Sequence, residues 1–214
     1  MNDKLILVAI AVSTLFIGAF FFALSLIYKA QEKKRLRFTN TFLFEVTPRF
    51  NEKYNFVNFL LFFGLTVCYF PYIYYVIYNM NTSSVTIMIL SVILLFCLAA
   101  LPFISLSKLR EHYYLALGGL VCLLALLVME GYYCFRMYRL YMDDMQLTAM
   151  IVAFSLAVLV LVAIFNPKLF DLKNQKTDSG TYKRKNFIFL AFTEWMLYPF
   201  MILSLVPMLL ISLQ

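Results

Sequence analysis

The sequence predicts an all-α polytopic membrane protein, a six-transmembrane-helix bundle with both termini outside and basic cytoplasmic loops. The first reason is composition: 64% of the 214 residues are hydrophobic and 14% are charged, whereas a soluble domain has about 25% charged residues. The second is that apolar runs of about 20 residues, the length of a transmembrane helix, recur along the chain. The third is that lysine and arginine gather in alternate loops. These features exclude an ordinary soluble enzyme and a disordered chain.

Six apolar runs are long enough to be transmembrane helices, and none of them contains lysine or arginine. They are continuously apolar, so they lack the alternation of apolar and polar residues that marks the strands of a membrane β-barrel. The loops between them leave no room for a separate folded domain, so we expect one domain over residues 1–214. The predicted spans are residues 5–28, 56–78, 85–106, 113–135, 147–165 and 187–213.

The first run is predicted to be a retained anchor. It is much longer than the apolar core of a signal peptide, which has 7–15 residues, and no small-residue cleavage site follows it. A basic cluster at residues 29–37 comes next and is typical of a segment that stays in the cytoplasm. The second and third runs are separated by the polar residues 79–84, which predict a tight hairpin.

The fifth run carries Ala149, Ala153 and Ala157 at a spacing of four residues. Small side chains let helices approach closely in lipid, so these alanines predict a helix-packing face. The simpler interpretation is contact within the bundle. The alternative is a docking face for a second membrane protein or for another copy of this chain.

The sixth run is the longest, and at helical rise it would measure about 40 Å, against a hydrocarbon layer of about 30 Å. We therefore expect it to tilt or kink. Pro199 and Pro207 lack a backbone N–H group, so they free the carbonyl groups of Trp195 and Leu203.

Glu130 and Glu194 are the acidic residues inside the predicted spans, and an ionisable group in hydrocarbon is by default a functional candidate. Glu194 lies about 10 Å from the cytoplasmic start of its span. With Trp195, Tyr198 and the freed carbonyl groups it suits an ion, proton or substrate site, although a static bent helix would also explain it. Glu130 lies near the outer interface, where a partly hydrated acid close to Arg136 is the simpler interpretation.

The positive charges give the orientation. Of the 18 Lys and Arg residues, 15 fall in the loops after the first, third and fifth spans. The positive-inside rule places these loops in the cytoplasm and both termini outside, so the expected location is the cytoplasmic membrane of the cell, with multiple passes. The basic residues expected to contact anionic lipid are Lys33, Lys34, Arg35, Arg37, Lys183, Arg184 and Lys185.

The first cytoplasmic loop, residues 29–55, contains an apolar patch at residues 42–46. We expect this patch to lie at the membrane interface or against the loop at residues 166–186. The basic charge does not predict nucleic-acid binding, because the chain lacks a folded basic module.

No metal or cofactor is predicted. The single histidine, His112, excludes a bis-histidine haem, and the four cysteines lack the spacing of a zinc site. No catalytic residues are predicted either, since His112 and Cys122 lie about 15 Å apart along one helix, too far for a nucleophile and its base. His112 is interpreted as an interfacial residue beside Arg110 and Glu111.

Two functions fit the sequence. The first is a transport component, either a small permease or a membrane subunit of a larger transporter complex, suggested by the kinked, acid-bearing sixth span and the alanine face of the fifth. The alternative is a non-enzymatic interaction protein of the membrane, such as a toxin-immunity protein, a sensor or an assembly factor. An intramembrane enzyme is less favoured than either, because the sequence offers no nucleophile–base pair.

Overall fold

The computed structural model describes residues 3–32, 35–42, 84–101, 109–169 and 187–212, and these ranges form helices and connecting turns with no strand. The predicted all-α fold is confirmed for this part of the chain. The predicted second span, residues 56–78, lies outside the described residues. The helices are α1 (Asp3–Glu32), α5 (Ser84–Ala100), α6 (Leu109–Tyr141), α7 (Asp144–Phe165), α8 (Phe189–Leu203) and α9 (Leu205–Ser212).

Within the described residues, three helical stretches are long and apolar enough to cross a membrane: Glu111–Tyr141, Asp144–Phe165 and Phe189–Pro207. Gly18–Ala30 and Val85–Ala100 are shorter apolar helical stretches. Large apolar side chains also point away from the protein interior, with Phe96 67% exposed and Phe165 76% exposed. Outward apolar surface on long helices is compatible with an integral membrane protein. The number of spans and their orientation stay predictions.

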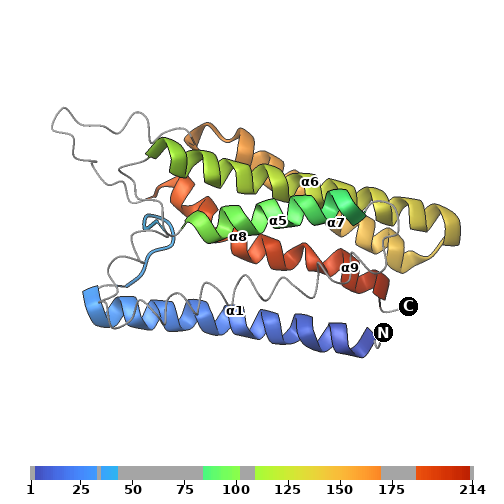
Figure 1. Ribbon diagram of the computed structural model, residues 1–214, viewed down its shortest axis with the longest axis horizontal. Coiled ribbons are helices and arrows are strands. Elements are labelled where there is room, and N and C mark those ends of the chain that lie inside the picture. The colour runs from blue at the N-terminus through green and yellow to red at the C-terminus, as the bar shows by residue number, and fades with distance from the viewer. Residues whose placement is uncertain (1–2, 33–34, 43–83, 102–108, 170–186, 213–214) are drawn as a thin grey trace.

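The helices run alongside one another, and the ends of the chain lie together (Figure 1). The connection between α6 and α7 lies at this same end, while the segment Arg35–Phe42, the start of α6 and the start of α8 lie at the opposite end. The predicted topology also places the two termini and the α6–α7 loop on one side.

The α6–α7 hairpin is the most closely packed pair of helices in the described part of the chain. Ala149, Ala153 and Ala157 are buried in it. At Gly131 a methyl group would lie 2.9 Å from the ring of Phe154, so this glycine permits the close approach. The alanine face is used for packing within this chain, and a bulky substitution at Ala153 would therefore report on folding rather than on docking of a partner.

The predicted sixth span divides into α8 and α9 at Ser204, which lies in a turn. Pro199 lies inside α8 without ending it. The division has a local cause, because Pro207 has no N–H group to donate to the carbonyl group of Leu203, the last residue of α8. Ser204 stabilises the turn with a hydrogen bond from its hydroxyl group to the Met201 carbonyl oxygen, at 2.6 Å.

Candidate functional site: a buried histidine–glutamate pair

His112 and Glu194 meet inside the protein. His112 lies in the first turn of α6 and Glu194 in the second turn of α8. His112 Nε2 and Glu194 Oε1 are 2.5 Å apart, and both side chains are 0% exposed. A proton lies between the two atoms, whichever of them carries it. The pair therefore links two helices through ionisable groups that are fully removed from solvent.

The position of His112 at the membrane interface stays a prediction, but its side chain is fully buried, because α6 turns it into the protein instead of toward the surface. Its partner is 82 positions away in the sequence. One signal in the sequence does point to the pair: the fourth and sixth predicted spans both begin on the cytoplasmic side, and each has an ionisable residue close to that start. The sequence does not indicate that these two helices are neighbours.

α6 and α8 pack directly against each other at Gly119 of α6. A methyl group added at Gly119 would lie 3.4 Å from Leu197 of α8, an ordinary van der Waals distance. Both helices begin at the same end of the molecule (Figure 1), so their first turns lie at similar heights. This geometry brings His112 to Glu194.

Trp195 and Tyr198, predicted to share a site with Glu194, are buried with it on α8. Their polar atoms bridge to other parts of the chain. The Trp195 indole N–H donates to the Thr41 carbonyl oxygen at 2.6 Å, and the Tyr198 hydroxyl donates to the Leu98 carbonyl oxygen at 3.2 Å. These two residues therefore tie α8 to the segment after α1 and to α5.

The Tyr198 hydrogen bond has a cause that can be read from the sequence. In a continuous helix the Leu98 carbonyl would accept from the residue four positions later, but that residue is Pro102, which has no N–H group. Tyr198 supplies a donor from another helix instead. Buried carbonyl groups are commonly satisfied in this way when proline removes the helical donor.

Tyr198→Phe is expected to lower the free energy of unfolding by about 1 kcal/mol, because it removes a buried hydrogen bond and leaves the ring in place. Denaturant titration in detergent micelles measures the change. Tyr132→Phe is the matched control, since Tyr132 is an exposed residue of α6. Equal destabilisation by both substitutions would show that the Leu98 bond contributes nothing.

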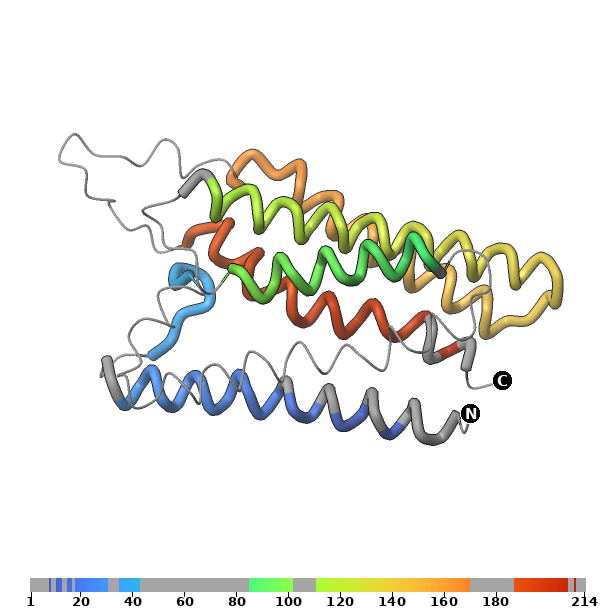
Figure 2. Tube along the Cα trace, in the orientation of Figure 1, coloured from blue at the N-terminus to red at the C-terminus, as the bar shows by residue number. Residues whose placement is uncertain are grey.

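The segment Arg35–Phe42 covers the pair. The Phe42 ring lies edge-on to the His112 ring with 5.8 Å between centroids, and Phe38 packs in the same way on Trp195 at 4.9 Å. Figure 2 shows this segment turning from the end of α1 toward the start of α8. Phe42 is the described residue of the apolar patch at residues 42–46, and it is buried against His112 of α6. Residues 43–46 lie outside the described part of the chain.

Glu130 does not join this site. It lies on α6 about 27 Å from His112 along the helix axis, at about 1.5 Å per residue. Its side chain is fully buried, as is that of Cys134 one turn later. The expectation of a partly hydrated acid is therefore wrong, because α6 turns this position toward neighbouring helices. The two intramembrane acids occupy opposite ends of the molecule.

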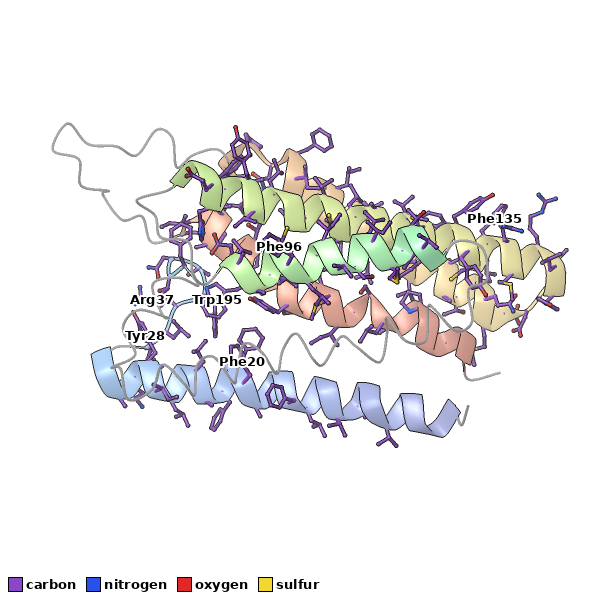
Figure 3. The ribbon with its side chains drawn as sticks, viewed as in Figure 1. Phe20, Tyr28, Arg37, Phe96, Phe135 and Trp195 are labelled. Atoms are coloured by element: carbon purple, nitrogen blue, oxygen red, sulfur yellow. The ribbon has the colours of Figure 1, made fainter. Side chains whose placement is uncertain are left out.

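Of the residues predicted to contact anionic lipid, Arg35 and Arg37 are described, and both are exposed. Arg37 lies at the same end of the molecule as Trp195 (Figure 3). The other five, Lys33, Lys34, Lys183, Arg184 and Lys185, lie outside the described residues.

The site has the chemistry of a proton carrier. Imidazole is the side chain that most readily gains and loses a proton near neutral pH. A carboxylate in contact with the imidazole alters how readily it binds that proton. Within the described ranges, no cluster of three or more His, Cys, Asp and Glu residues could hold a metal ion.

No protein-family model, curated protein or solved structure matches the chain. A proposal for its function therefore depends on the apolar helices and on the buried His112–Glu194 pair.

Proposed function

We propose that the chain is an integral membrane transport component, either a small permease or a membrane subunit of a larger transporter complex, in which the His112–Glu194 pair holds a transported or coupling proton. The observation that carries the proposal is the complete burial of this pair between α6 and α8, which belong to the helical stretches Glu111–Tyr141 and Phe189–Pro207, each apolar and long enough to span a membrane. In this proposal Arg35 and Arg37 contact anionic lipid headgroups at the same end.

Energetics support a functional pair. Removing two charged groups from water costs several kcal/mol for each ion, and well-packed apolar residues of similar volume are often at least as stabilising. Ionisable groups in hydrocarbon are therefore rare, and those that exist mark ion and proton pathways. A pair used only to hold α6 against α8 could be replaced by leucines.

The position of the pair also supports coupling. Because His112 belongs to α6 and Glu194 to α8, the number of protons bound to the pair determines how strongly these two helices attract each other at this point. Imidazolium and carboxylate attract each other, whereas imidazolium and a protonated carboxyl group lack this Coulomb attraction. Proton uptake thus loosens the contact between α6 and α8. A transporter requires this kind of link between ion binding and helix movement.

The test is proton flux in liposomes. The protein is purified in mild detergent together with any subunits that accompany it, reconstituted around a pH-sensitive dye, and given a pH gradient. Glu194→Gln and His112→Gln are expected to reduce flux at least tenfold, about the effect of losing one charge-assisted hydrogen bond. Glu111→Gln is the matched control, because Glu111 is exposed and adjacent to His112; it should transport like the wild type.

Two results would contradict the proposal. The first is wild-type flux no greater than that of empty liposomes. The second is wild-type flux that persists unchanged in Glu194→Gln and His112→Gln. Either result would favour the alternative, a membrane interaction protein that uses its helices only as binding surface.

A further inference from the structure

We infer that the segment Arg35–Phe42 is a gate that closes the His112–Glu194 pair to the end of the molecule at which Arg35 and Arg37 are exposed. The role in transport rests on the proposed function, whereas the covering of the pair does not. Three contacts carry the inference. Phe42 packs on the His112 ring, the Trp195 indole N–H donates to the Thr41 carbonyl oxygen, and the Ile188 backbone N–H donates to the Thr39 carbonyl oxygen at 2.7 Å.

The gate is a short, internally bonded turn. The backbone N–H groups of Asn40 and Thr41 both donate to the Arg37 carbonyl oxygen, at 3.1 and 3.0 Å. Leu36 and Phe42 are buried by the fold, while Arg37 is exposed. The segment therefore presents the Phe42 ring to His112 and charge to its surroundings, so that in this inference it keeps water from the pair.

The contacts that hold the gate shut come from α8, the helix that carries Glu194. Ile188 is the N-cap residue of α8, and Trp195 directly follows Glu194. The residue that the gate covers, His112, belongs to the other helix. When a change in the proton count of the pair shifts α8 relative to α6, the Thr39 and Thr41 hydrogen bonds are strained together and the Phe42 ring is free to leave His112. Opening of the gate is in this way linked to the state of the pair.

The chain offers a direct measure of opening, because His112 is its single histidine. Diethyl pyrocarbonate modifies imidazole only when the ring is accessible, and peptide mass spectrometry locates the product at His112. The rate of this modification is measured for the wild type and two variants in liposomes. Phe42→Ala removes the ring that covers His112, and Trp195→Phe removes the indole N–H that holds Thr41. Phe22→Ala is the matched control, since Phe22 is an exposed residue of α1.

Phe42→Ala and Trp195→Phe are each expected to raise the modification rate of His112 by about tenfold, because loss of packing or of a buried hydrogen bond increases the open population. Phe22→Ala should match the wild type. Variants are compared at a temperature at which their thermal unfolding has not begun, so that exposure does not report unfolding. Unchanged rates in both gate variants would overturn the inference.

The same variants separate the gate from the proposed function. In the flux assay, a leak that is larger in Phe42→Ala than in wild type supports a gate on the transport path. Wild-type flux that needs Glu194, together with unchanged His112 reactivity in both variants, rejects the gate and leaves the transport proposal standing. Faster modification of His112 in the gate variants, combined with flux that is unchanged in Glu194→Gln, rejects the transport proposal. The segment is then a cover over a structural pair.

Discussion

Glu194→Leu is expected to destabilise the protein by about 3–5 kcal/mol, because it leaves the imidazole of His112 in the interior without its hydrogen-bonded carboxyl partner. His112→Leu should have an effect of similar size. The double substitution should be less destabilising than either single one, since apolar side chains then pack where charges were. Unfolding titrations of the four proteins in the same detergent measure the coupling free energy.

The control for this cycle is Glu111→Leu, which changes an exposed acid beside His112 and should leave stability nearly unchanged. Additive effects of the two single substitutions would show that His112 and Glu194 do not interact. A double variant as stable as the wild type but without proton flux would separate the two roles. Such a protein would demonstrate that the pair is retained for chemistry and not for stability.

Trp195→Ala is expected to lower the free energy of unfolding by about 3–5 kcal/mol, the usual range for truncating a buried large aromatic residue. The indole lies among the rings of Phe21 and Phe38, with centroids 5.9 and 4.9 Å away. It also bonds the Thr41 carbonyl oxygen. Truncation therefore removes the contact that joins α1, the gate segment and α8 at once (Figure 3).

Thermal unfolding in detergent, followed by intrinsic fluorescence of the tyrosines, measures this loss. Phe96→Ala is the control, because Phe96 points away from the interior and its truncation creates no cavity. We expect it to unfold within a few degrees of the wild type. A Trp195→Ala protein that unfolds at the same temperature as Phe96→Ala would show that the aromatic contacts around Trp195 are not stabilising.

The proposed mechanism places binding and access at one end of the molecule. The pair joins α6 to α8, the gate covers it, and two contacts from α8 hold the gate. In this proposal, a proton that reaches the pair from the end at which Arg35 and Arg37 are exposed must first displace Phe42. Glu130 lies about 27 Å from His112 along α6, so its role is a separate question for Glu130→Gln in the flux assay.

Several features of this chain follow from its sequence. Long apolar runs without Lys or Arg predict helices because a backbone in hydrocarbon must satisfy its own hydrogen bonds. The described boundaries match the predicted ones closely for the fifth run, predicted at residues 147–165 and found at Asp144–Phe165. Pro207 likewise indicated a disruption in the last run, and Glu194 was marked as a functional candidate by its position alone.

The tertiary structure decided what Glu194 contacts and what covers it. A sequence gives the depth of a residue along its own helix, but helix rotation and the choice of neighbouring helices depend on packing between side chains far apart in the chain. For this reason His112 was assigned to the interface and Glu130 to a hydrated position, although both are buried. The hydrogen bonds of Trp195 to Thr41 and of Tyr198 to Leu98 could not be predicted from the sequence either, because each joins residues about a hundred or more positions apart. The sequence by itself determined the helices and their candidate acids, while packing between α6, α8 and the segment Arg35–Phe42 placed one of those acids in a buried, covered pair with His112.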